Sequence, residues 1–185
     1  PYTANPEAPD DYRCFLVGEP LDEDLYITGV TIDPGESAIV HHVLLYAIVP
    51  EAVEQVQAMD NEDDVLGYTC FGGPGVSSSQ TLAAWAPGGT PFVTPEGSAI
   101  RVEAGSRMVM QVHYNLAYLT PDAEVPPDMS ETLLWTLEED APLNKLIRIL
   151  PFADLDIALE AGAPEVIEGK DFDIPFSGTI IGAIP

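Results

Sequence analysis

Prolines and glycines interrupt this chain so often that little room is left for long helices: 18 Pro and 15 Gly occur among 185 residues. Between these breaks lie short runs rich in β-branched and aromatic residues, which is the pattern of strands joined by turns. We expect strands at Tyr12–Val17, Leu25–Ile32, Ala38–Ile48, Ala99–Val102, Arg107–Tyr114, Thr132–Leu137, Lys145–Leu150 and Thr179–Ile184. Their spacing predicts an all-β fold built as an antiparallel β-sandwich, jelly-roll-like in architecture.

One segment carries a helical pattern. Apolar residues recur at helical spacing over Glu51–Met59, Pro50 stands ahead of them, and the acidic run Asp60–Asp64 follows. This predicts a helix of one or two turns. The glycine- and serine-rich stretch Phe71–Ser79 and the stretch Ala86–Pro91 are predicted to be loops.

The chain divides into three parts by composition. Residues 1–11 are proline-rich and acidic, as expected of an N-terminal arm or linker. Residues 12–140 form the predicted first β-sandwich domain, and the acidic, proline-containing break Glu138–Pro142 marks its end. Residues 141–185 are predicted to start a second, incomplete β-domain. Because the chain stops within an apolar run, we expect the natural polypeptide to continue past Pro185.

The balance of charge is strongly acidic, with 31 acidic and 6 basic residues and a formal net charge of −25. This excludes nucleic acid as a partner, because its phosphates would be repelled, and it disfavours anionic membranes likewise. The same field attracts divalent cations and opposes an anionic reductant. No basic-then-apolar leader opens the sequence, and no apolar stretch has the length of a membrane helix.

The chain has two cysteines, Cys14 and Cys70. In an exported protein two cysteines most simply form one disulfide, whereas in the cytosol they would be free thiols. Their spacing matches no zinc-binding motif. We favour the disulfide, and therefore a secreted or periplasmic location.

Only three histidines occur, and two of them are adjacent. His41 and His42 lie in the most apolar predicted strand, and His113 lies in another apolar strand. A lone histidine in a strand is more often a hydrogen-bonded structural residue than a ligand, and this reading stays open for the three. Three neutral imidazoles without thiolates favour copper or a catalytic zinc.

Strand geometry sets a condition on such a site, because successive side chains of a regular strand point to opposite faces. His41 and His42 cannot both face one ion from an ideal strand. We therefore expect a β-bulge or a strand end at this pair, or binding at the sheet rim through different ring nitrogens.

Four motifs together resemble a known family. Val40-His-His-Val-Leu-Leu-Tyr46, Ala84-Trp-Ala-Pro87 with Thr94-Pro-Glu-Gly97, Gly105-Ser-Arg107 and Gln111-Val-His-Tyr114 are similar, in order and spacing, to the copper type II ascorbate-dependent monooxygenases. This family includes peptidylglycine α-hydroxylating and dopamine β-monooxygenases. The resemblance runs from about residue 12 to residue 115 and continues weakly beyond.

The resemblance implies a role for particular residues. His41, His42 and His113 match the three ligands of the family's first copper, which stores and delivers an electron. Tyr12 and Gln111 match residues close to that copper, although ordinary packing is the alternative for both. Cys14 and Cys70 match a disulfide of the family.

The resemblance further implies C–H hydroxylation with O2 and an external, ascorbate-like reductant. In the family a second copper, held by a His-x-His pair and a methionine in a second domain, binds oxygen and substrate. No His-x-His pair exists in this chain, so we expect it to need the remainder of the second copper domain and to be inactive alone. A stand-alone copper-binding or electron-delivery module and a metal-free adhesion-type sandwich are the alternatives.

Overall fold

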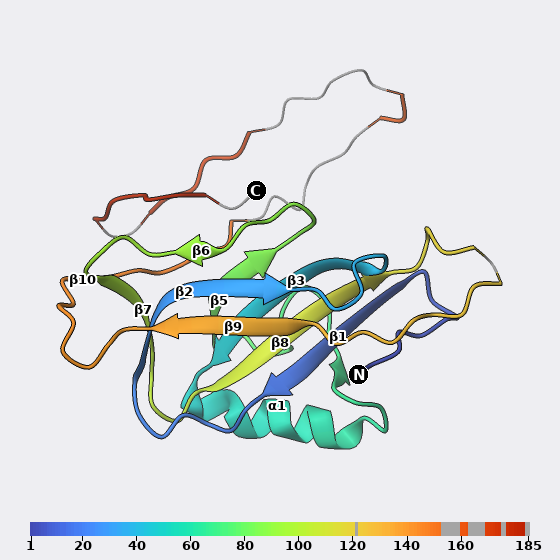
Figure 1. The fold of residues 1–185 in the computed structure, drawn as a ribbon, viewed down its shortest axis with the longest axis horizontal. Helices are drawn as coiled ribbons and strands as arrows, with labels where there is room; N and C mark the ends of the chain where they lie inside the picture. The colour runs from blue at the N-terminus through green and yellow to red at the C-terminus, as the bar shows by residue number, and fades with distance from the viewer. Residues whose placement is uncertain (121, 153–159, 163–168, 175–176, 184–185) are drawn as a thin grey trace. The chain divides into compact units, whose positions relative to one another are not determined.

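A computed structural model describes residues 1–120, 122–152, 160–162, 169–174 and 177–183. The chain divides into two compact units, Pro1–Ile149 and Leu150–Pro185. The first unit contains every strand of the described chain and one helix, α1 (Figure 1). The predicted all-β sandwich is therefore confirmed. The first unit extends to Ile149, and it includes the short pairing of β10 with β7.

Two sheets make up the first unit. The first sheet has the order β4-β1-β8-β3-β5, and its neighbours are all antiparallel. Its strands are β1 (Asp10–Val17), β3 (Val40–Ile48), β4 (Tyr68–Thr69), β5 (Ser79–Trp85) and β8 (Arg107–Asn115). The second sheet has the order β10-β7-β2-β6, with β9 also paired to β2. Its strands are β2 (Leu25–Asp33), β6 (Phe92–Val93), β7 (Ser98–Val102), β9 (Glu131–Thr136) and β10 (Lys145–Leu146).

The first sheet is buried on both faces. Its inner face, including Val43, Leu45 and Val112, joins Ile27 and Ile100 of the second sheet in the main core. Its outer face lies under α1 (Pro50–Glu62) and makes a second, smaller core with the two cysteines. Burial on both faces explains why β3 and β8 are almost continuously apolar instead of alternating.

The helix starts and ends close to the predicted positions but is longer than one or two turns. Pro50 stands in its first turn, where a missing N–H costs nothing, and Ala52 and Val56 are its buried residues. It ends at Glu62, within the acidic run Asp60–Asp64 that was expected to follow the helix. Packing of this buried stripe on the sheet stabilises the additional turn.

Two predicted strands differ from the structure. Lys145–Leu150 is a strand only at 145–146, and the described residues 179–183 of the predicted strand Thr179–Ile184 are not a strand. For residues 179–183 the reason is that an extended segment needs a neighbouring strand to hold it, and the described part of the second unit offers none. Conversely, β5 was not predicted, since Ser79–Trp85 is composed mainly of small and polar residues.

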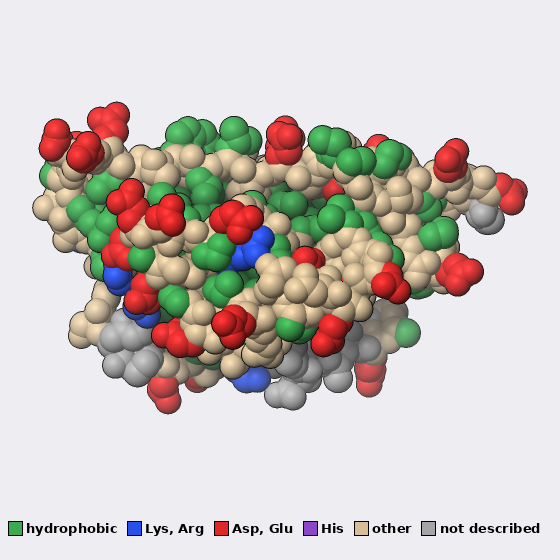
Figure 2. All heavy atoms as spheres, turned by 90° about the horizontal axis from the view of Figure 1, so that it is seen from below, with side chains coloured by type: hydrophobic (Ala, Val, Ile, Leu, Met, Phe, Trp, Pro, Cys, Tyr) green, Lys and Arg blue, Asp and Glu red, His purple; other side chains and the backbone are tan. Residues whose placement is uncertain are grey.

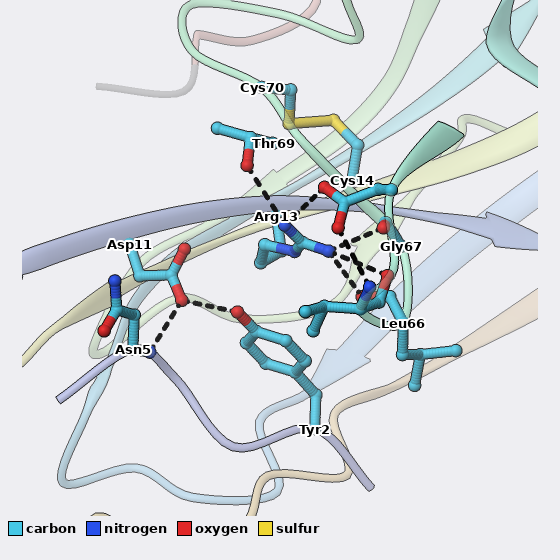
Figure 3. A network of polar contacts seen from close by, with 11 residues as sticks. Tyr2, Asn5, Asp11, Arg13, Cys14, Leu66, Gly67, Thr69 and Cys70 are labelled. Atoms are coloured by element: carbon cyan, nitrogen blue, oxygen red, sulfur yellow. Dashed lines mark hydrogen bonds and ion pairs between the residues drawn. A yellow bond between two sulfur atoms is a disulfide. The ribbon is translucent and has the colours of Figure 1, made fainter. Parts of the chain in front are cut away.

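Arg13 anchors the segment between α1 and β4 to strand β1 (Figure 3). The side chain is buried, and its two terminal nitrogens bond to the Asp63 carboxylate, the Thr69 hydroxyl and the carbonyl oxygens of Val65, Leu66 and Gly67 at 2.6–3.0 Å. The guanidinium also lies 5.4 Å from the centre of the Tyr2 ring. Tyr2 is buried as well and donates a hydrogen bond to Asp11, so the predicted N-terminal arm is packed on the first sheet.

Candidate metal centre

The three histidines come from neighbouring strands of the first sheet. His42 on β3 lies opposite His113 on β8, whereas Val40 lies opposite Tyr114. Two residues of β3 therefore correspond to one step along β8, and His41 is the extra residue of a β-bulge. This is one of the arrangements that strand geometry required for two adjacent side chains to approach one ion.

The bulge also lies near the end of the sheet. Within the described chain, β5 pairs with β3 only from Val43 onward. The part of β3 that carries His41 and His42 therefore has no partner strand on the β5 side. A strand end of this kind leaves the side chains of His41 and His42 accessible from outside, and His41 is exposed. An ion can thus reach the three rings without a change of fold.

The three Nδ1 atoms converge. His42 Nδ1 lies 3.3 Å from His41 Nδ1 and 3.3 Å from His113 Nδ1. The three residues each offer one nitrogen, and these nitrogens lie within 4.8 Å of one another. An imidazole nitrogen lies about 2.0 Å from a zinc-sized divalent ion, which puts two ligands at a tetrahedral angle about 3.3 Å apart. The spacing fits an ion shared by the three rings.

The protonation state of the rings also suits metal binding. Burial, followed by the neighbouring His113 and His41 rings, lowers the pKa of His42 to about 4. His42 is therefore neutral at neutral pH and has a lone pair to offer. A proton on His42 Nδ1 can satisfy one of its two neighbours but not both, so the cluster lacks donors for its lone pairs. A bound cation can accept these lone pairs in place of the missing donors.

Tyr12 lies directly against His113. The two rings are stacked, with centroids 4.0 Å apart and planes 5° from parallel. This contact follows from the register, because Tyr12 on β1 is opposite His113 on β8. Phe71, which is largely exposed, meets the Tyr12 ring edge-on at 5.0 Å. Tyr12 therefore lies beside the three histidines.

Asp10 is a residue of the site that the sequence did not indicate. Its carboxylate lies 2.8 Å from His113 Nε2 and accepts a 2.8 Å hydrogen bond from the Asn115 side chain. The bonds from His113 and Asn115 lower the pKa of Asp10. Only the pairing of β1 with β8 brings Asp10 and His113 together, since they are far apart in the sequence.

Gln111 lies near the disulfide and not among the histidine rings. Its side-chain amide donates to the carbonyl of Gly73 at 3.0 Å and lies 3.3 Å from the Cys70 sulfur. The predicted bridge between Cys14 and Cys70 is formed, and it ties β1 to the segment after β4 (Figure 3). Gln111 thus supports the loop that covers the outer face beside the site.

No described helix has both the length and the apolar composition needed to cross a membrane. Acidic side chains are scattered over the face in Figure 2, and basic ones are few. That distribution agrees with the net charge of −25. It favours a cation over an anion near the protein surface.

Comparison with known proteins identifies the family. No curated protein matches the chain. Residues 1–120 match the family model described as the N-terminal domain of copper type II ascorbate-dependent monooxygenases. The matched part is well over half of the 185 residues and contains the three histidines and both cysteines. Copper, the metal named in the family, is a metal that three imidazoles suit. The chain belongs to the copper type II ascorbate-dependent monooxygenase family.

Proposed function

We propose that this chain supplies the electron-transfer copper site of a monooxygenase that hydroxylates a C–H bond with O2 and an ascorbate-like reductant. His41, His42 and His113 are the proposed ligands. The observation that carries the proposal is the convergence of three Nδ1 atoms at a β-bulge, with nearest separations of 3.3 Å. Membership of the family adds the identity of the metal and the class of reaction.

Each proposed ligand residue has a distinct task. A bound copper ion supplies one-electron redox chemistry by changing between its cuprous and cupric states. His113, buried and stacked on Tyr12, offers a nitrogen whose position is fixed by the sheet. His42 is half-buried and neutral, and His41, exposed on the bulge, can adjust its ring as the ion changes its preferred geometry.

The proposal assigns no oxygen-activating role to this chain. The family's second copper uses a His-x-His pair, and the three histidines of this chain include none. We therefore propose that the remainder of a second copper domain is a required partner, and that residues 141–185 begin it while residues 12–140 form the first copper domain. The Cys14–Cys70 disulfide supports a secreted or periplasmic location, where such bonds persist.

Copper titration of the purified chain tests the proposal. We expect the wild type to bind one copper, measured by metal analysis after gel filtration, and His42→Ala and His113→Ala to lower the affinity more than about 100-fold. Loss of a residue outside the ligand set already costs about 10–100-fold at metal sites, so loss of a ligand should exceed that. Tyr118→Ala is the matched control, because this aromatic side chain is 88% exposed.

The same titration separates the alternatives. A metal-free adhesion-type sandwich would bind no stoichiometric copper, and a His42→Ala variant with normal copper content and redox cycling would contradict the proposed ligand set. A stand-alone electron-delivery module would bind copper and exchange electrons in full, yet no second copper domain would be found joined to it in the natural polypeptide. That last observation distinguishes the module from half of a monooxygenase.

A further inference from the structure

We propose that Asp10 is a positioning residue that fixes which nitrogen of His113 faces the metal. The inference rests on the proposed copper site and extends it to a residue outside the ligand set. It starts from the 2.8 Å contact between the Asp10 carboxylate and His113 Nε2.

The chemistry of the two groups decides the direction of the hydrogen bond. An ionised carboxylate can only accept, so His113 Nε2 must carry the hydrogen. The Asp10 side chain is partly exposed, and an aspartate carboxyl in contact with water is ionised at neutral pH. In a neutral imidazole with its hydrogen on Nε2, the lone pair is on Nδ1. His113 Nδ1 is the atom that lies 3.3 Å from His42 Nδ1.

Two further contacts hold this arrangement. The Tyr12 ring stacks on His113 with planes 5° from parallel, which fixes the plane of the imidazole. With that plane fixed, two ring orientations remain, related by a half-turn about the Cβ–Cγ bond, and the bond from Nε2 to Asp10 selects one of them. Asn115 donates a 2.8 Å hydrogen bond to the same carboxylate oxygen, Oδ1, and so fixes Asp10 in turn. Plane, rotation and tautomer of His113 are therefore all set before any ion binds.

The carboxylate also adds a negative charge one imidazole away from the ion. Carboxylates bonded to the free nitrogen of a ligand histidine make that ligand more basic and are themselves important for affinity. A negative charge close to the site favours the cupric over the cuprous state. Asp10 thus has two effects, one on geometry and one on the redox balance.

The first test needs no metal. In the copper-free protein, nitrogen NMR of the imidazole rings should show His113 as a single tautomer with its hydrogen on Nε2. Asp10→Ala should convert it to a mixture. Glu103→Gln removes one negative charge in the turn between β7 and β8, and it should leave the tautomer unchanged. A His113 tautomer that does not respond to Asp10→Ala overturns the inference.

The second test measures the metal. Asp10→Ala should weaken copper binding about 10–100-fold, and Asp10→Asn, which keeps an acceptor but no charge, should weaken it less. Both variants should raise the reduction potential relative to wild type and Glu103→Gln. A residue that served only the fold would shift the unfolding midpoint without changing the tautomer or the potential.

The two proposals fail in different ways. If the wild type binds no copper, the proposed function is wrong, whereas the tautomer measurement still reports on Asp10. If the wild type binds copper and both Asp10 variants match it in affinity, potential and tautomer, the copper site stands and the role of Asp10 is wrong.

Discussion

Two polar regions lie on opposite faces of the same strand, and their chemistry is opposite. Tyr12 and Arg13 are neighbours in β1, and Tyr12 faces the histidine cluster while Arg13 faces the segment between α1 and β4. The Arg13 charge is matched inside the protein, by a carboxylate, a hydroxyl and three carbonyl oxygens. Within the described chain, only its Nε atom lacks a partner.

In the histidine cluster, by contrast, the polar atoms are not all matched by partners inside the protein. Of its ring nitrogens, His113 Nε2 has an acceptor in Asp10, but the three Nδ1 atoms face mainly one another. Lone pairs directed at lone pairs are unfavourable unless a proton or a cation lies between them. The comparison teaches how to distinguish the two kinds of polar group: a structural one is satisfied by the fold, and a binding site is left for its ligand to satisfy.

The largest expected effect tests the structural role of the buried Arg13 side chain. Arg13→Met should lower the free energy of unfolding by about 3–5 kcal/mol, because it leaves the Asp63 charge and three carbonyl oxygens without their donor. Denaturant unfolding at neutral pH measures the loss. Arg101→Met is the matched control, since Arg101 forms an ion pair with Asp24 on the surface, and such pairs contribute about 0–1 kcal/mol. Equal losses in the two variants would contradict the structural role of Arg13.

Part of this contrast could be predicted from sequence. Apolar composition located β3 and β8, and the rarity of histidine directed attention to His41, His42 and His113. The pairing of particular residues could not be predicted. Asp10 and Arg13 acquire their roles only when β1 is aligned against β8 and β4. Likewise, β5 is a strand because it pairs with β3, and its small and polar residues give no local signal.

The next largest effect tests whether the histidine cluster binds copper. Copper that binds only the folded chain should stabilise it by about 2.7 kcal/mol at a free concentration 100 times the dissociation constant. Thermal unfolding with and without copper measures this gain. It should vanish in His113→Ala, a variant whose copper-free fold should remain intact. A gain of equal size in that variant would show that copper acts elsewhere on this acidic protein.

The smallest effect concerns the acid partner of Arg13. The Arg13 hydrogen bond, with a further backbone bond from Val65, lowers the pKa of Asp63 below its ordinary value. A carboxyl with a lowered folded-state pKa stabilises the fold above its unfolded pKa of about 3.9, and this contribution disappears as the pH falls through the folded value. Asp63→Asn should therefore cost about 1 kcal/mol at neutral pH.

The pH dependence distinguishes this loss from a general effect of substitution. As the pH falls below the unfolded pKa of about 3.9 and then through the lowered folded value, the wild-type carboxyl becomes protonated and resembles the amide in charge. The difference in unfolding free energy between wild type and Asp63→Asn should therefore shrink over this range. Comparing the two proteins at each pH cancels the titration of the other acids. A difference that stays constant from pH 7 to pH 3 would mean that the Asp63 charge is not what Arg13 requires. The buried guanidinium would then be held by its hydroxyl and carbonyl partners alone.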